Sequence, residues 1–283
     1  MKKRIFLPFF LAFLAAVCYP FLNSDAPDST EGNLCVSFLD VGQGDSTFIE
    51  LPDGKTALID AGEAEYAESI IDYIKNRGYK KLDYIICTHP HADHIGGMHA
   101  VIEAFSVGEV YMPKVSHTSR AYERLLEAVK AKGLSVHAAR AGVEIANQDG
   151  INMQFVAPCD DSYEELNDFS AVLHVTYGST AFLFTGDAES LSENEMLTSG
   201  AKLQADVLKV GHHGSNSSSQ KRFLQAVRPE WAVISAGADN DYGHPSEKVL
   251  TRLRATGAEI VRTDEAGTVI FISDGHTVTM GGN

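Results

Sequence analysis

Three histidines and one aspartate fall within six residues, at His89, His91, Asp93 and His94. They follow the predicted strand 82–87, which is apolar over 84–87, so they lie where a buried strand gives way to a turn. Imidazole nitrogens and carboxylate oxygens are donors that zinc, iron and manganese accept in proteins. A single histidine is usually structural, but metal binding explains a cluster of this density better. The segment therefore predicts a site whose alternate side chains point toward two metal ions.

The spacing H-x-H-x-D-H, followed by Ile95-Gly96-Gly97, resembles the metallo-β-lactamase superfamily. The resemblance runs from about residue 34 to the C-terminus and includes three further motifs in chain order, at 59–62 (IDAG), 185–187 (TGD) and 210–215 (VGHHGS). It implies that Asp60 supports a ligand without binding metal, that Asp187 bridges two metals, and that the last motif holds the final metal-binding histidine.

Three other motifs are similar to the extracytoplasmic hydrolase-like domain of the ComEC family of competence proteins. They are FLDVGQGDS at 38–46, LKVGHHGS at 208–215 and YGHP at 242–245. This resemblance implies phosphodiester cleavage, with single-stranded DNA as the leading substrate. Because the sequence has only one long apolar segment, DNA transport is not implied.

From this pattern we expect His89 and His91 to bind one ion, and Asp93 and His94 the other, with Asp187 between them. Two divalent ions, either zinc or manganese, would share that carboxylate and lower the pKa of a bridging water. The resulting hydroxide makes hydrolysis the expected reaction, with Asp93 taking part in catalysis as well as in metal binding.

The last two motifs add three histidines. We expect His212 to complete the second metal position, because it is the first histidine after the strand at 206–210. His213 is then free to support a ligand or to contact substrate. His244, in a Gly-His-Pro turn, is a candidate to protonate a leaving group or to bind an anionic oxygen, although it is equally well explained as an ordinary turn residue.

The chain departs from the superfamily between Asp93 and Asp187. Many of these enzymes supply another metal-binding histidine there, whereas this chain has Asn167 and Asp168 at what looks like the equivalent place. Either residue is a candidate oxygen donor to the more weakly coordinated ion, which makes manganese as plausible as zinc. His174 is close in sequence, but it lies in an alternating strand and is better explained as structural.

The elements that position these residues alternate between strands and helices. Strands predominate in each half of the folded region, and helices end each half, which predicts a layered α/β protein, a four-layer αββα sandwich. The histidine cluster follows a predicted strand and precedes a helical pattern over 95–105. Predicted strands are also followed by Asp187 and by the pair at 212–213, so several strand ends are expected to converge on the site.

The first 24 residues have the layout of an export signal. Lys2, Lys3 and Arg4 precede residues 5–22, which contain no charged side chain. We expect residues 1–24 to be a signal peptide or an N-terminal membrane anchor, residues 25–33 a linker, and residues 34–283 one hydrolase domain. Cys18 leaves a lipid anchor as a third option. The protein is therefore expected to be exported, either secreted or attached to the outer face of the cytoplasmic membrane through residues 5–22.

The composition limits the function further. The chain has 23 basic and 38 acidic residues among 283, a formal net charge of −15. A nucleic-acid binder normally has a basic surface, so bound metal or a local basic patch would have to offset this charge. No serine-nucleophile elbow, phosphate-binding loop or dinucleotide motif is present. The alternatives are another hydrolase of this fold, acting on a lactone, thioester, β-lactam or choline phosphoester, and a non-catalytic binding module. No protein partner can be inferred.

Overall fold

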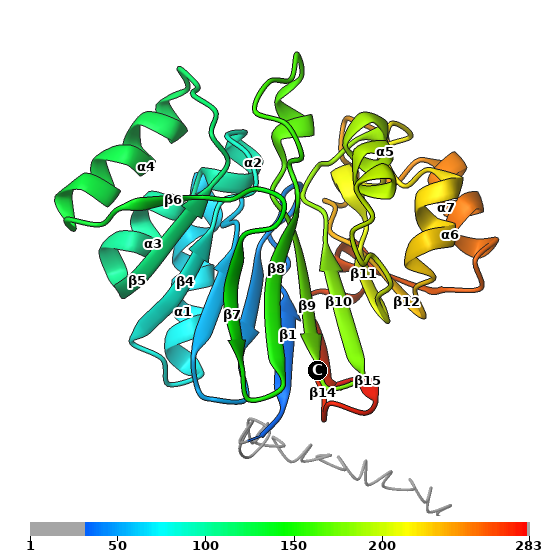
Figure 1. Cartoon of the computed structure of the whole chain (residues 1–283). Helices are drawn as coiled ribbons and strands as arrows, with labels where there is room; N and C mark the ends of the chain where they lie inside the picture. Colours follow the sequence, from blue (N-terminus) through cyan, green and yellow to red (C-terminus); the bar gives the residue numbers. More distant parts are fainter. Residues whose placement is uncertain (1–31, 282–283) are drawn as a thin grey trace, which may run out of the picture.

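Two β-sheets pack face to face at the centre of the molecule in the computed structural model, which describes residues 32–281 (Figure 1). Within that range, the strand orders are β15-β14-β1-β2-β3-β4-β5-β6 in one sheet and β13-β12-β11-β10-β9-β8-β7 in the other. The first sheet comprises β1 Leu34–Phe38, β2 Thr47–Glu50, β3 Thr56–Ile59, β4 Lys81–Ile86, β5 Ser106–Met112, β6 Val136–Ala138, β14 Val269–Ser273 and β15 Val278–Met280. The second comprises β7 Glu144–Gln148, β8 Ile151–Ala157, β9 Val172–Tyr177, β10 Thr180–Phe184, β11 Val207–Lys209, β12 Trp231–Ile234 and β13 Glu259–Arg262.

Helices cover the outer face of each sheet, so the predicted four-layer αββα arrangement is confirmed (Figure 1). Helices α1, α3 and α4 pack on the first sheet, and α5, α6 and α7 pack on the second. The helical segments are η1 Ala64–Tyr66, α1 Ala67–Asn76, α2 Ala92–Ile95, α3 Met98–Ala104, α4 Arg120–Ala131, η2 Leu166–Phe169, α5 Ser190–Ser199, η3 Gly211–Gly214, α6 Lys221–Val227, α7 Glu247–Arg254 and α8 Thr263–Ala266.

The inner faces of the sheets share one apolar core, because alternate residues of each strand point to the same side. Phe38 of β1 lies 5.9 Å from Phe184 of β10 and 6.0 Å from Phe271 of β14, measured between ring centroids. All three rings are buried. Aromatic pairs of this kind add about 1 kcal/mol each beyond their burial, and the Phe38–Phe184 pair joins the two sheets.

The helix expected over 95–105 forms as α3, and a separate short helix, α2, precedes it, with Gly96 and Gly97 between the two. A Cβ on Gly96 would lie 2.5 Å from the Ala92 carbonyl oxygen, and one on Gly97 would lie 2.4 Å from the Ala61 carbonyl oxygen. The two glycines therefore allow a close backbone approach just after the histidine cluster.

The expected export segment at 1–24 and nearly all of the linker at 25–33 fall outside the described residues. Within the described range, none of the helices has the length and apolar character needed to cross a membrane.

Strands that run parallel to one another end at the same edge of each sheet, and this places the site. β3 pairs in parallel with β4, and β10, β11 and β12 are mutually parallel. The chain leaves β3 at Asp60, β4 shortly before His89, β10 shortly before Asp187 and β11 shortly before His212. In an open α/β architecture, the carboxyl ends of strands are where ligands bind.

Candidate metal centre

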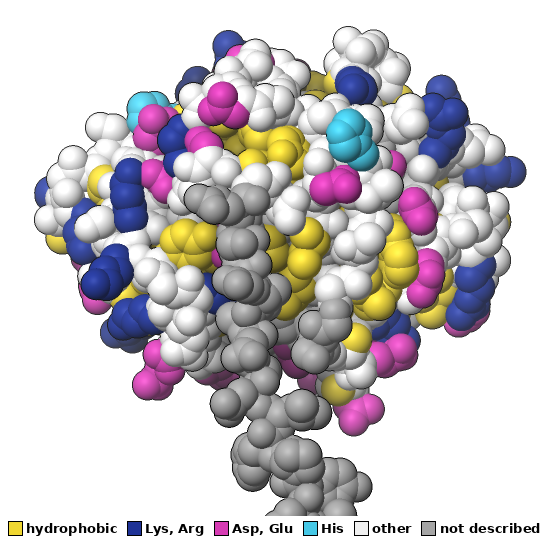
Figure 2. All heavy atoms as spheres, turned by 90° about the horizontal axis from the view of Figure 1, so that it is seen from below, with side chains coloured by type: hydrophobic (Ala, Val, Ile, Leu, Met, Phe, Trp, Pro, Cys, Tyr) yellow, Lys and Arg dark blue, Asp and Glu magenta, His cyan; other side chains and the backbone are white. Residues whose placement is uncertain are grey.

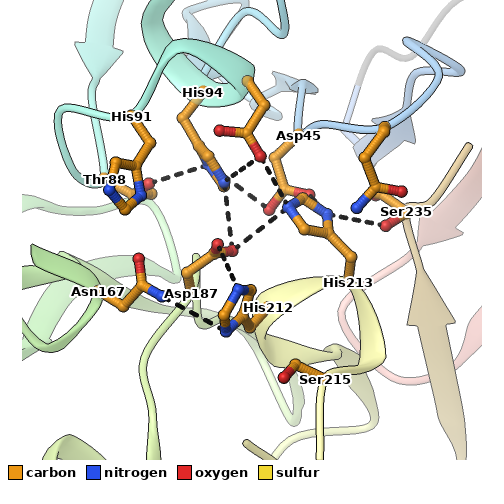
Figure 3. A network of polar contacts seen from close by, with 12 residues as sticks. Asp45, Thr88, His91, His94, Asn167, Asp187, His212, His213, Ser215 and Ser235 are labelled. Carbon is orange, nitrogen blue, oxygen red and sulfur yellow. Dashed lines mark hydrogen bonds and ion pairs between the residues drawn. The ribbon is translucent and has the colours of Figure 1, made fainter. Parts of the chain in front are cut away.

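Asp187 lies at the centre of the site, with donor groups facing each of its two carboxylate oxygens (Figure 3). On the Oδ1 side, His94 Nε2 is 3.2 Å away and His213 Nε2 is 3.7 Å away. Asp93 Oδ2 closes this group, at 3.2 Å from His213 Nε2 and 3.8 Å from His94 Nε2. Ligand atoms of these four residues all lie within 4.8 Å of one another, which is the spacing of a single metal position.

The Oδ2 side of Asp187 faces a second, more open group. His89 Nε2 lies 3.8 Å from Oδ2, and His212 Nε2 lies 3.7 Å from the same oxygen. His91 Nδ1 is 2.9 Å from His89 Nε2, so these two nitrogens point into a common space. The turn after β4 therefore directs His89 and His91 to one side of the Asp187 carboxylate, and Asp93 and His94 to the other.

Three imidazoles are held at Nδ1, which leaves Nε2 of each directed toward Asp187. His94 Nδ1 contacts Asp60 Oδ2 at 2.8 Å, His213 Nδ1 contacts the Ser235 carbonyl oxygen at 3.0 Å, and His212 Nδ1 contacts Glu189 Oε1 at 3.0 Å. A carboxylate or carbonyl on the far nitrogen is the usual partner of a metal-binding histidine, since it fixes the ring orientation and tautomer.

One observation that does not depend on any sequence motif indicates that these residues fit a metal ion. Within residues 32–281, His94 Nε2 and Asp187 Oδ1 are buried and form no hydrogen bond, although they lie 3.2 Å apart. Buried polar atoms are normally satisfied, and divalent metal is the ligand that would satisfy a nitrogen lone pair and a carboxylate oxygen together.

The electrostatics of the cluster favour cations. Burial alone would raise the pKa of Asp187, but His94, His213 and His89 outweigh it and hold the pKa well below the usual range. Burial opposes charge on His213, yet Asp187, Asp45 and Asp93 raise its pKa to about 10. The carboxylates thus attract positive charge strongly.

The structure places the other predicted residues in different roles. Asp60 is fully buried and accepts hydrogen bonds from the Thr88 backbone N–H at 2.8 Å and from the Thr88 hydroxyl at 2.6 Å, in addition to its contact with His94. Asp168 accepts a hydrogen bond from the Ser192 backbone N–H at 3.3 Å, so it faces the start of α5 instead of the cluster. His174 Nε2 contacts the Gln204 carbonyl oxygen at 2.9 Å and is an ordinary strand histidine.

His213, and not His212, lies beside Asp93 and His94, which is the reverse of the order expected from the sequence. The reason is local backbone geometry. Both histidines have left-handed conformations, with φ of 49° at His212 and 51° at His213, inside the short turn η3. Two consecutive residues of this kind send their side chains in directions that a strand or helix pattern does not predict.

Two residues that the motif analysis did not select are part of the site. Asp45 Oδ1 lies 3.3 Å from His213 Nδ1, and Asp45 Oδ2 forms a 2.7 Å ion pair with Lys209. Both side chains are buried. Burial would raise the pKa of Asp45, but Lys209 and then His213 lower it to about 2. The sequence did contain a signal for both residues, because Asp45 lies in the 38–46 motif and Lys209 in the 208–215 motif.

A cavity of about 610 Å³ opens over the cluster. His91, Asp93 and Asp187 form its floor together with His212, His213 and His244, and the rest of its lining includes Gln43, Glu63, Glu65, Tyr66 and Tyr242. Tyr242 is 72% exposed and its ring stacks on His244 at 5.8 Å. Burial and the neighbouring imidazoles lower the pKa of His244 to about 4, so its ring is neutral at pH 7.

Comparison with known proteins supports this picture at the level of family. The family model of the metallo-beta-lactamase superfamily matches residues 39–238. ComE operon protein 3 of Bacillus subtilis is 31% identical over 279 residues, which cover 93% of this chain and 34% of that protein. Competence protein ComA of Neisseria gonorrhoeae is 34% identical over 243 residues, or 85% of this chain and 32% of that protein. The chain thus spans about a third of the length of these relatives. The resemblance inferred from the motifs is confirmed.

Two solved structures share the fold at low sequence identity. The metallo-beta-lactamase fold protein YhfI from Bacillus subtilis has a TM-score of 0.54 at 13% identity and covers 83% of this chain and 98% of its own. CmlA, a diiron beta-hydroxylase from Streptomyces venezuelae, has a TM-score of 0.53 at 15% identity and covers 81% of this chain and 52% of its own. These likenesses show the fold alone, because one fold can carry different chemistries.

Proposed function

The chain belongs to the metallo-beta-lactamase superfamily, and from that membership we propose that it is an exported, metal-dependent phosphodiesterase with single-stranded DNA as its leading substrate. The observation that carries the proposal is the Asp187 carboxylate, whose two oxygens each face a separate group of imidazole donors. The fold and this donor set support a metal-dependent hydrolase. The similarity to competence proteins supports a phosphodiester of DNA as the substrate and an exported or membrane-attached location.

The residues of the site would divide the work. Divalent ions, zinc or manganese, supply Lewis-acid polarisation of phosphate oxygens and lower the pKa of water when they are bound. Asp93, His94, His213 and Asp187 would hold one ion, and His89, His91 and Asp187 the other. Asp60 fixes the orientation of His94 through its Nδ1 contact.

His244 is placed to bind an anionic oxygen. Its neutral ring lines the cavity close to His212, at 5.5 Å between ring centroids. A neutral imidazole donates one N–H to a phosphate oxygen. It is a poor source of a full proton for a leaving group at pH 7, so of its two expected roles we favour oxygen binding.

The mouth of the cavity suggests how a nucleic acid would lie. Glu63 and Glu65 make one part of it acidic, which repels a phosphate backbone. Tyr242 offers an exposed ring beside His244. Stacking of a base on an aromatic ring is worth about 1–3 kcal/mol and tolerates any base sequence. We therefore propose that an unpaired base stacks on Tyr242 while its phosphate enters the cavity.

Cleavage of single-stranded DNA and of bis(p-nitrophenyl) phosphate tests this function, in metal-free protein and in protein supplied with Mn²⁺ or Zn²⁺. We expect metal-dependent cleavage of both substrates, and loss of about 100-fold or more in Asp93→Ala, because this removes a donor from the compact group. Full cleavage by Asp93→Ala, or by metal-free protein, would contradict the proposal.

A second candidate is hydrolysis of a phosphoester that carries a cationic headgroup, such as a choline phosphoester. The specific support is the acidic part of the cavity lining, Glu63 and Glu65, beside the exposed ring of Tyr242, since a quaternary ammonium binds to aromatic faces and carboxylates. A panel that adds p-nitrophenyl phosphorylcholine to the two substrates above separates these candidates. Preference for the choline ester over DNA would favour the second.

A further inference from the structure

The chain lacks a histidine where the superfamily pattern expects the third imidazole of the first metal position. The segment that replaces it, η2, offers the side chains of Asn167 and Asp168, neither of which carries an imidazole. Asp168 is used at the start of α5 by the Ser192 backbone N–H. Asn167 Nδ2 lies 3.2 Å from Glu189 Oε1 and 3.4 Å from His212 Nδ1, so Asn167 contacts a histidine of another turn.

His212 lies at the side of Asp187 where that imidazole is missing. Its Nε2 is 3.7 Å from Asp187 Oδ2, and His89 Nε2 approaches the same oxygen to 3.8 Å from β4. Two donors that bind one ion at about 2.0–2.1 Å each lie roughly 3–4 Å apart. The ring is partly buried, with 24% of its side chain exposed, and it lines the same cavity as His91.

The hydrogen-bond partners behind the His212 ring are those usual for a metal-binding histidine. Glu189 Oε1 contacts its Nδ1 at 3.0 Å, and Glu189 is itself held by the Ser217 hydroxyl at 3.0 Å and by Asn167. The neighbouring His213 is arranged in the same way on the other side of Asp187, with Nδ1 held by the Ser235 carbonyl oxygen and Nε2 directed at Asp93 and Asp187. A carboxylate behind the ring orients Nε2 and raises its basicity as a ligand.

The left-handed backbone of η3 makes this possible, because it lets consecutive side chains reach both oxygens of one carboxylate (Figure 3). Non-glycine residues in this conformation cost about 1–2 kcal/mol each and are concentrated at functional sites. A cost accepted at two adjacent histidines is accounted for if both rings are ligands.

We propose that His212 is the third imidazole of the first metal position, with His89, His91 and Asp187, while His213 completes the second with Asp93 and His94. The tandem histidines would thus serve two different ions, and His212 would replace the histidine that η2 lacks. This inference rests on the two-ion centre of the proposed function and assigns the ligands within it.

Metal binding by the full chain tests the inference without reference to activity. Metal-free protein is titrated with Mn²⁺ and with Zn²⁺ by isothermal calorimetry, and the bound ions are counted by elemental analysis. The variants are His212→Gly, His213→Gly, His89→Ala and the double variants of His212→Gly with each of the other two. Glycine is used at 212 and 213 because it adopts positive φ freely. His276→Ala, in an exposed turn, is the matched control.

We expect about two ions per chain in the wild type and in His276→Ala, and one tight ion with a second weakened about 100-fold or more in His212→Gly. His89→Ala combined with His212→Gly should lose no more than His89→Ala alone, because both act on one ion. His213→Gly combined with His212→Gly should lose both ions.

Two outcomes would overturn the inference. One is wild-type affinity for both ions in His212→Gly, which would make His212 a contact for substrate. The other is a double variant at 212 and 213 that still binds one ion tightly, which would place both rings on a single ion. Far-UV circular dichroism and a second variant, His212→Asn, which tolerates the left-handed backbone, separate misfolding from ligand loss. Two ions without phosphodiester cleavage would refute the proposed function and leave the ligand assignment standing.

Discussion

At the scale of single residues, Asp45 and Lys209 determine how His213 is held. The buried ion pair between them is 2.7 Å long, and the other oxygen of Asp45 contacts His213 Nδ1. Removing one partner of a buried ion pair typically costs about 3–5 kcal/mol, because it leaves an uncompensated charge. We expect Lys209→Met to lower the free energy of unfolding by this amount, measured by chemical denaturation of metal-free protein.

The double variant Asp45→Asn/Lys209→Met separates stability from metal binding. Removing both charges should recover part of the stability that Lys209→Met loses. The double variant should not restore the contact between residue 45 and His213 Nδ1. Its affinity for the ion that His213 binds should therefore remain about 10–100-fold below the affinity of the wild type, measured by calorimetric titration. If the double variant binds both ions normally, Asp45 has no part in orienting the ring.

The residue scale also shows what the sequence could predict about the site. His89, His91, Asp93 and His94 are close in the chain, so their spacing alone was enough to place them together. The order of His212 and His213 was not predictable, because it depends on backbone angles set by packing around η3. One such contact is Gly214, where a Cβ would lie 2.5 Å from Cβ of Pro245, a residue distant in sequence.

At the scale of elements, the turn η3 depends on Gly214, which has a φ of +83°. We expect Gly214→Ala to destabilise the protein by about 2–4 kcal/mol, from backbone strain and from the contact with Pro245, and to weaken metal binding at His213. Gly200→Ala is the matched control, since Gly200 has a similar φ of +78° after α5 but nothing lies within 4 Å of its Cβ position.

Gly200→Ala should cost about 1 kcal/mol from the backbone alone and leave metal affinity unchanged. Thermal unfolding and calorimetric titration of both variants check this comparison. Equal effects of the two substitutions on metal binding would show that the close packing of η3 against Pro245 does not position His213.

Helices α5 and α6 are joined by a buried carboxylate that should make stability depend on pH. Glu193 of α5 accepts hydrogen bonds from the backbone N–H groups of Ser219 and Gln220, just before α6. Burial raises the pKa of Glu193 to about 8 from its ordinary 4.5, against the effect of these hydrogen bonds. Between pH 4.5 and 8 the folded protein therefore keeps a proton that the unfolded chain has lost.

The stability from this group is complete below pH 4.5 and is lost as the pH rises toward 8, at about 1.4 kcal/mol per pH unit within that window. We expect Glu193→Gln to remove this contribution, which denaturation of the metal-free variant and wild type at several pH values would measure. Identical pH profiles would show that Glu193 is ionised in the folded state at pH 7.

The elements themselves were largely predictable, and the exceptions have local causes. The alternation of strand and helix patterns gave the layered fold, since periodicity depends on residues that are near neighbours in the chain. The break between α2 and α3 was not foreseen, because Gly96 and Gly97 are needed for contacts with Ala92 and with the loop after β3. Glycine at such positions reflects close backbone approach, which becomes visible only in three dimensions.

At the scale of the whole molecule, the metal centre lies where the two sheets meet. Gln43, after β1, accepts a hydrogen bond at 3.0 Å from the Gly237 backbone N–H, after β12. The opposite end of the molecule shows a different distribution, with Lys and Arg side chains gathered mainly toward the two helical flanks (Figure 2). The acidic groups nearest a bound cation would be Asp93 and Asp187, inside the cluster.

Because the first sheet supplies Asp93 and His94 and the second supplies Asp187 and His213, a bound ion would join the two sheets. Metal should therefore stabilise the molecule as one unit. At an ion concentration 100-fold above the dissociation constant, each site adds about 2.7 kcal/mol, which for a chain of this size raises Tm by about 5–10 °C. The measurement is thermal unfolding with and without Mn²⁺, followed by far-UV circular dichroism and by the fluorescence of Trp231.

Trp231 is the single tryptophan of the chain, and its ring in β12 packs on Phe271 of the other sheet at 5.3 Å, so it reports on the junction between the sheets. We expect both signals to give one transition that metal shifts upward by the same amount. Asp187→Asn should abolish that shift, because it weakens both donor groups at once. Two separate transitions, of which metal moves only one, would mean that the ion binds within one half of the molecule and does not join the sheets.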